Sequence, residues 1–272
     1  MTVADRWQLG APYERYIGRW SRLVASRFVD GLCAPHGLRW IDVGSGTGVL
    51  VAAILDQCAP SSVLGVDPSE GFLEVARVRP RVTGRPAARF EVGDAEHVPV
   101  ADGSADVVVS GLVLNFVPDP PAALAEFSRI AAPGALVGAY VWDYAEGMEL
   151  LRLFWDAATS VDPDAAALDE GRRFPLCAPE PLRDLWTSAP GMDADSVVVQ
   201  SIDVDSVFAD FDDLWDPFLG AQGPAPSYLA ETTDAARTEI RDRMRAATAS
   251  RTRSDGAIEL HARAWSVSGR LE

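Results

Sequence analysis

The sequence predicts an α/β fold built on a doubly wound, mostly parallel sheet. Short apolar runs of strand length alternate along the chain with stretches of helical periodicity, the pattern of repeated strand–helix units. The run 38–43 meets three alternate glycines and then a helix-like segment, 49–55, which is the order strand, tight turn, helix. With 272 residues, 48% of them hydrophobic, the chain can form one large domain with a full core.

Each expected strand is an apolar run that ends at a turn signal. Strands are expected at 38–43, 62–66, 88–92, 105–110, 135–142, 196–208 and 258–268. Helical spacing of apolar residues predicts helices at 12–33, 47–57, 70–78, 120–132, 146–160, 179–189 and 232–248. We expect Ser69 to be the N-cap of the third helix and Pro133-Gly134 to end the fourth.

The segment 209–256, between the last two strands, is too long for a plain turn. We interpret it as a helical insertion over the active-site edge; a packing appendage without a ligand role is the alternative. The chain then reads as a single domain, 1–272. Its parts are an N-terminal helical lid, a ligand-binding core, a helical segment and the insertion, at 1–36, 37–145, 146–195 and 209–256.

The net charge and the cysteine content of the sequence indicate which binding partners and which cellular compartment to expect. The net charge of −16 repels a polyanion over most of the surface and argues against a nucleic-acid partner. Three scattered cysteines form no disulfide framework, which favours a reducing, cytoplasmic location. The first thirty residues lack a signal-peptide core, and no apolar run is long enough to span a bilayer. All 24 basic residues are Arg, a bias typical of a GC-rich, bacterial genome.

The most informative stretch is Asp42-Val43-Gly44-Ser45-Gly46-Thr47-Gly48. Glycines permit positive φ and let a ligand approach the backbone, and the helix behind them presents free N–H groups. The next strand ends in Asp67, a carboxylate of the kind that holds ribose hydroxyls. Together these features predict a nucleotide-type binding crevice.

The glycine spacing does not fit the dinucleotide fingerprint G-x-G-x-x-G/A, because the third small residue would be Val49 or Val51. A nicotinamide oxidoreductase is therefore the less favoured alternative. The D-x-G-x-G-x-G spacing, with Asp67 ending the next strand, resembles class I S-adenosylmethionine (SAM) methyltransferases, in their ubiquinone/menaquinone-type (type 11) branch. Gly93-Asp94-Ala95-Glu96 and 125–134 extend the resemblance over 38–142. It implies a Rossmann-like, seven-stranded sheet whose last strand is antiparallel.

The resemblance also implies roles for individual residues. The backbone of the loop would touch the methionine part of SAM at Gly44, Ser45, Gly46 and Gly48. Asp42 would face the ammonium group of SAM, and Asp67 would hold both ribose hydroxyls, since a carboxylate is a two-oxygen acceptor. The family has a further glycine where Ala135 stands, a change that affects a turn and not the site.

The remaining cofactor contacts are expected at the ends of the neighbouring strands. Pro68 would flank the adenine, Asp94 would accept from its N6, and Ala95 would supply a backbone N–H. Ser110 and Leu112 would lie at the crevice where the strand order reverses. From the first helix, Tyr16 or Arg19 is expected to close over SAM, with Arg19 a candidate partner for its carboxylate.

The expected reaction is in-line displacement of the SAM methyl group by an O, N or C nucleophile of a small molecule. Asp143, after the fifth strand, and His261, in the seventh, are candidate bases; Asp143 capping a turn and His261 packing in the sheet are the alternatives. The fourth strand ends at Ser110, so Asp143 alone is too little for a dedicated metal site. A SAM-binding protein with a different activity is the other alternative.

Overall fold

The computed structural model describes residues 18–220 and 223–272. These residues form two compact units. The sheet unit comprises Ser21–Val141, Leu176–Ile202 and Ala264–Glu272, and the helical unit comprises 18–20, Trp142–Pro175 and Asp203–Arg263. The expected parts of the chain do not coincide with these units. The expected helical segment 146–195 is divided, with 146–175 in the helical unit and 176–195 in the sheet unit, while 209–256 lies in the helical unit.

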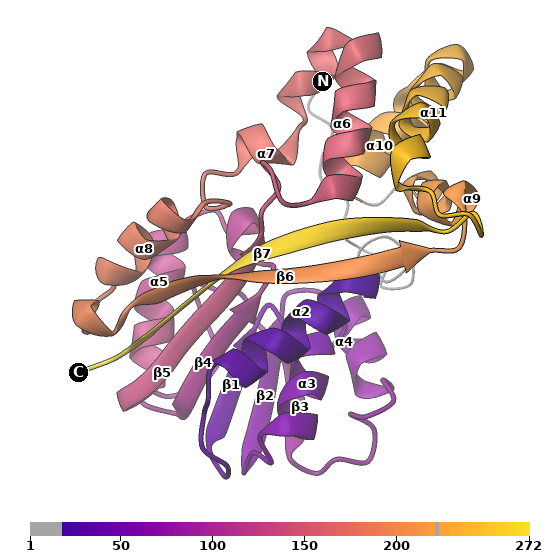
Figure 1. Ribbon diagram of the computed structural model, residues 1–272. Helices are drawn as coiled ribbons and strands as arrows, with labels where there is room; N and C mark the ends of the chain where they lie inside the picture. The colour runs from indigo at the N-terminus through magenta and orange to yellow at the C-terminus, as the bar shows by residue number, and fades with distance from the viewer. Residues whose placement is uncertain (1–17, 221–222) are drawn as a thin grey trace. The chain divides into compact units, whose positions relative to one another are not determined.

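The strands form one seven-stranded sheet of order β3-β2-β1-β4-β5-β7-β6 (Figure 1). Their bounds are β1 Arg39–Val43, β2 Ser62–Asp67, β3 Ala88–Val92, β4 Ala105–Gly111, β5 Ala131–Trp142, β6 Val198–Phe208 and β7 Ile258–Arg270. The first five pair in parallel. Leu271 N donates to Ala135 O and Asp143 N donates to Arg263 O, so β7 runs antiparallel to β5. The predicted fold class is confirmed.

Helices cover both faces of the sheet unit (Figure 1). On one face lie α2 (Gly18–Gly31), α3 (Val49–Gln57) and α4 (Glu70–Arg77); the rings of Phe28 and Tyr140 pack there with centroids 4.8 Å apart. On the other lie α5 (Pro120–Ile130) and α8 (Pro179–Thr187), where Phe127 and Trp186 are fully buried and the Trp186 indole donates to Val137 O. Burial of these large side chains stabilises the sheet from both sides.

The helical unit contains α6 (Glu149–Val161), α7 (Glu170–Arg173), α9 (Phe211–Trp215), α10 (Pro224–Glu231) and α11 (Asp234–Thr248). Its aromatic rings pack on one another: Phe154 stacks on Phe218 at 4.7 Å, and Trp155 lies 5.9 Å from Tyr228. Helix α11 confirms the helix expected at 232–248, whereas α7 has no counterpart among the predicted elements.

Most predicted elements lie within a few residues of the observed ones, and β3 coincides with its prediction. Ser69 caps α4 as expected, accepting from Phe72 N. Strand β5 is the exception, since it begins at Ala131 rather than at 135. Ala131 pairs with Ala105 across an irregular register, and a proline such as Pro133 can join a strand at such a bulge because its missing N–H is not needed there.

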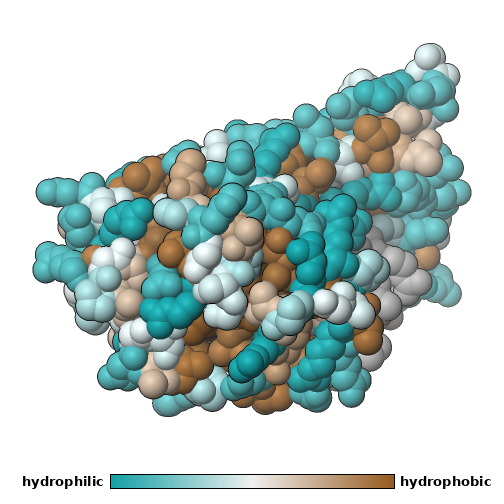
Figure 2. Space-filling view, turned by 90° about the horizontal axis from the view of Figure 1, so that it is seen from below, coloured by the Kyte–Doolittle hydropathy of each residue, from teal (hydrophilic) through white to brown (hydrophobic). Residues whose placement is uncertain are grey.

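The surface is mixed in character. Figure 2 shows one face, on which hydrophilic residues surround smaller hydrophobic areas. Within residues 18–220 and 223–272, no helix has the length and apolar character needed to cross a bilayer.

Candidate functional site

The loop between β1 and α3 carries the glycines at positive φ: 76° at Gly44, 52° at Gly46 and 79° at Gly48. Gly48 is the N-cap of α3 and has no side chain to occupy the first N–H groups of the helix. The helix N-terminus behind the loop adds a partial positive charge. The start of α3 thus lacks a side-chain cap at the carboxyl end of β1. In the loop itself, the N–H groups of Gly44 and Ser45 donate to Val66 O, and that of Gly48 donates to Ser45 O.

The glycines serve different purposes. A Cβ at Gly44 would lie 2.3 Å from Cγ2 of Val113, so only glycine lets the segment after β4 pack on the loop. A Cβ at Gly46 would meet none of the described atoms within 4 Å, which leaves this side of the backbone accessible to a ligand. A Cβ at Gly48 would lie 3.0 Å from Ala76 Cβ, a tight contact with α4.

The loop is held from two sides. At the end of β2, the Asp67 carboxylate accepts from Gly46 N at 2.8 Å and from Ser69 N at 2.9 Å, one bond on each oxygen. Arg79, just after α4, donates to Thr47 O at 2.6 Å and to Thr47 Oγ1 at 2.9 Å. The Arg79 contact was not predicted; it joins residues 32 apart, and no sequence motif marks it.

Asp67 itself is 7% exposed, and burial raises its pKa while the two backbone donors oppose the rise. A carboxylate has about four lone-pair sites, so two remain on Asp67 for hydroxyl donors. This geometry fits the ribose role expected for Asp67.

Asp42 is the most unusual group of the site. Its side chain is 1% exposed, and neither carboxylate oxygen has a hydrogen-bond partner among the described residues. Burial, and secondly the charge of Asp67, raise its pKa to about 8. The buried hydroxyl of Ser45 likewise has no partner there. An unpaired buried carboxylate is costly, and a cationic ligand group at this position would relieve the cost.

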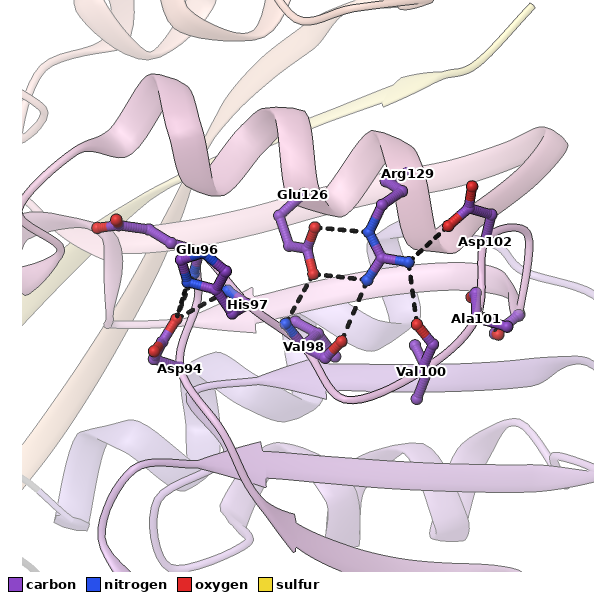
Figure 3. Close-up of polar contacts among 10 residues, drawn as sticks. Asp94, Glu96, His97, Val98, Val100, Ala101, Asp102, Glu126 and Arg129 are labelled. Carbon is purple, nitrogen blue, oxygen red and sulfur yellow. Dashed lines mark hydrogen bonds and ion pairs between the residues drawn. The ribbon is translucent and has the colours of Figure 1, made fainter.

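The segment after β3 brings Asp94 beside Asp67, because β2 and β3 are neighbours and Gly93 N bonds Asp67 O at 3.3 Å. Asp94 Oδ1 accepts from Glu96 N and His97 N, which closes a tight turn around Ala95 (Figure 3). The Asp94 side chain is 59% exposed and so accessible to a ligand. Pro68 lies directly after β2 and is exposed.

The end of β4 is fixed and strained. Ser110 Oγ donates to Val43 O at 2.8 Å, which ties β4 to the end of β1 at the point where the strand order reverses. Leu112 adopts φ 65°, a left-handed conformation that a branched residue adopts at a cost of about 1–3 kcal/mol. Its N–H bonds Tyr140 O at 2.8 Å. Strain of this kind concentrates at functional sites.

Asn115, in the 3-10 turn Leu114–Phe116 after β4, was missed by the sequence reasoning. Its Nδ2 donates to Cys177 Sγ at 3.2 Å, while its buried Oδ1 has no partner in the part of the chain that the structure describes. If the amide oxygen and nitrogen of Asn115 were assigned the other way round, the nitrogen would lack a hydrogen-bond partner in place of the oxygen. The residue's place after β4 was the one available signal.

Four candidates are not among the described residues of the sheet unit. Tyr16 is outside the described residues, and Arg19, Asp143 and His261 belong to the helical unit. Arg19 is already engaged there: it pairs with Asp213 at 2.7 Å, donates to Val207 O, and lies 4.4 Å from the centroid of the Phe208 ring.

Asp143 and His261 have contacts that suit structural roles. Asp143 is 3% exposed, and its Oδ1 accepts from Glu146 N, which caps a turn. The two ring nitrogens of His261 lie 3.0 Å from Asp203 and 2.9 Å from Asp205. These hydrogen bonds, that of Asp205 first, raise the pKa of His261, and a protonated imidazole cannot accept a proton.

Gly44→Ala should lower the free energy of unfolding by about 1–3 kcal/mol, because the added Cβ overlaps Val113 and the φ of 76° is strained for alanine. Gly46→Ala, with open space beside it, should cost less, and urea unfolding of the two variants measures the difference. Equal losses would contradict the packing role of Gly44.

Asp42→Asn should change how stability depends on pH. Since the folded pKa of Asp42, about 8, lies above the unfolded value, its protonated form favours folding, and that contribution is lost as pH rises through about 8. Between pH 5 and pH 8, the free energy of unfolding of the variant should therefore rise relative to that of the wild type by up to about 1.4 kcal/mol per pH unit. Urea unfolding over this range measures it; parallel curves would refute the assignment.

Comparison with known proteins agrees with this geometry. Residues 41–138 match the family model described as "Methyltransferase domain" (Methyltransf_11). The chain is 40% identical over 116 residues to a demethylmenaquinone methyltransferase of Renibacterium salmoninarum, covering 43% of this chain and 44% of that protein. It is 34% identical over 136 residues to a malonyl-[acyl-carrier protein] O-methyltransferase of Serratia marcescens, covering 50% and 48%. The chain thus spans about half the length of these curated relatives.

Two solved structures share the fold. The YcgJ protein of Bacillus subtilis superposes with a TM-score of 0.56 at 16% identity, covering 92% of this chain and 98% of that one. The Haemonchus contortus phosphoethanolamine N-methyltransferase 2, solved with S-adenosyl-L-methionine, has a TM-score of 0.56 at 17% identity, covering 96% and 56%. The resemblance inferred from the glycine loop is confirmed: the chain contains a class I, SAM-dependent methyltransferase domain of the type 11 branch.

Proposed function

We propose that the protein transfers a methyl group from SAM to an O, N or C nucleophile of a small molecule by in-line displacement. The observation that carries this proposal is the buried, unpartnered Asp42 beneath the glycine loop. SAM bears an ammonium group that would satisfy this carboxylate. The phosphates of a dinucleotide would instead bring negative charge to the same loop, which offers the Asp42 carboxyl no cationic partner and disfavours its ionised form further. The buried carboxyl of Asp42 thus favours SAM over NAD.

The residues of the sheet unit would divide the binding of SAM between them. When bound, SAM supplies a methyl group that its sulfonium already activates. Asp42 would hold the ammonium, the backbone at Gly46 would approach the methionine part, and Asp67 would orient the ribose. This leaves the protein to align the nucleophile and to exclude water, because no further activation of the methyl group is needed.

For the acceptor we propose contact with the segment after β4, because Leu112 is strained and Asn115 has an unpaired amide oxygen there. The names of two relatives give demethylmenaquinone and malonyl-[acyl-carrier protein] as their acceptors, which differ in chemistry and so select no single acceptor for this chain. The charge of −16 opposes a nucleic-acid acceptor.

We also propose a cytoplasmic, bacterial protein. Cys33, Cys58 and Cys177 form no disulfide bond with one another, in keeping with a reducing compartment. The curated relatives named above are bacterial.

Asp67→Ala should weaken SAM and S-adenosylhomocysteine binding about 100-fold, since both the ribose acceptor and the bond to Gly46 N are lost. Calorimetric titration with SAM, S-adenosylhomocysteine and NAD measures this. Asp106→Ala is the matched control, because Asp106 is a β4 carboxylate that holds Arg39 and lies outside the loop contacts. It should bind as the wild type does.

The wild-type titration also separates the alternatives. NAD binding without SAM binding would favour a nicotinamide oxidoreductase. SAM binding with no S-adenosylhomocysteine formed in a broad acceptor screen would favour a SAM-binding protein with another activity.

A further inference from the structure

The connection between β3 and β4, residues 93–104, has no regular secondary structure, yet two side chains of α5 bind its backbone (Figure 3). We call Glu126 and Arg129 the α5 clamp. Arg129 donates to both carboxylate oxygens of Glu126 at 2.7 Å, through Nε and Nη2. It also donates to Val98 O at 3.1 Å, to Val100 O at 2.9 Å and to Asp102 Oδ1 at 2.7 Å. All five N–H groups of the guanidinium are thereby used.

Glu126 completes the grip on Val98. Its Oε1 accepts from Val98 N at 2.7 Å, so the amide and the carbonyl of this one residue are both held by the clamp. The Val98 side chain is buried at 4% exposure. Arg129 holds the pKa of Glu126 below its usual range, so the pair stays ionised. Val98 is thus a fixed point in an otherwise irregular segment.

Between this fixed point and β3 lie Asp94 and Ala95. On the β3 side, Gly93 N bonds Asp67 O, and a Cβ at Gly93 would lie 2.8 Å from Pro99 Cδ, so the two ends of the turn are packed together. Within it, Asp94 Oδ1 accepts from Glu96 N and His97 N. The position of residues 94–98 is therefore set at one end by the contacts of Gly93 and at the other end by the clamp, which holds Val98.

Helix α5 has stabilising features of its own, apart from the clamp. Its N-terminus is capped by Asp119, which accepts from Ala122 N at 3.0 Å, and Pro120 occupies the first helical position. A partly exposed i,i+3 ion pair alone contributes little to stability. What distinguishes this pair is its set of backbone partners, all of which lie in residues 98–100 of the connection.

We propose that Glu126 and Arg129 are positioning residues for the cofactor: by fixing Val98 they hold Asp94 and Ala95 where these read the 6-amino edge of adenine. The inference rests on the proposed function, since it presumes that SAM binds in the sheet unit with its adenine at Asp94 and Ala95, as the resemblance implies. It assigns adenine selectivity to two side chains that do not touch the ligand.

The test compares S-adenosylhomocysteine with S-inosylhomocysteine, which carries oxygen in place of the 6-amino group, by calorimetric titration. The wild type should prefer S-adenosylhomocysteine by about tenfold or more, the loss expected for one hydrogen bond to a charged group. Arg129→Lys keeps the charge but cannot bind four acceptor groups from one ammonium. It should lower affinity for S-adenosylhomocysteine about tenfold and leave S-inosylhomocysteine within about twofold, so that the preference disappears.

Arg39→Lys is the matched control, because Arg39 makes a two-pronged pair with Asp106 in the same unit without contacting residues 93–104. It should keep the wild-type preference. Glu126→Gln, close in shape, should reduce the preference in the same direction, and it replaces Arg129→Lys if thermal melting shows that variant unfolded. Hydrogen exchange should rise in residues 94–100 of the clamp variants while α5 stays protected.

The outcomes separate the two proposals. If the wild type binds no S-adenosylhomocysteine, the proposed function fails before any variant is made. If the wild type binds both ligands equally, or if a folded clamp variant weakens both ligands by the same factor or neither, the positioning role is refuted and the proposed function stands.

Discussion

The arrangement of the site depends on the carboxylate of Asp67, which bonds the backbone of Gly46 on one oxygen and of Ser69 on the other. Through these bonds the end of β2 fixes both the glycine loop and the start of α4. The ends of β1 and β4 are joined by Ser110, and β3 joins β2 through Gly93. The carboxyl ends of four parallel strands are thus tied to one another by hydrogen bonds as well as by the sheet itself, which gives the ligand side of the domain a defined geometry.

The features predicted well from sequence are those set by local chemistry. The glycines at positive φ, the Ser69 cap and the strand ending in Asp67 each follow from a few adjacent residues. The features that were missed depend on distant partners. Arg79 acts on Thr47, Asn115 meets Cys177, and Arg129 binds a connection some thirty residues earlier in the chain. Pattern and propensity carry no information about such pairings.

The candidate bases show the same limit. His261 was selected for its place in the last strand, but its environment is set by Asp203 and Asp205 of β6, which the sequence pattern could not pair with it. Likewise β5 begins earlier than expected, because pairing with Ala105 outweighs the tendency of Pro133-Gly134 to form a turn. Tertiary contacts therefore set both the environment of His261 and the residue at which β5 begins.

The raised pKa of Asp42 would couple the proposed binding of SAM to the release of protons. Near neutral pH the free protein holds Asp42 largely protonated, with a pKa of about 8. A cationic ligand favours the ionised carboxylate, so binding is coupled to release of up to about one proton. At lower pH, protons then compete with the cationic ligand for the same carboxylate. The proposed binding of SAM would in this way weaken as the medium turns acidic, through a single residue of the glycine motif.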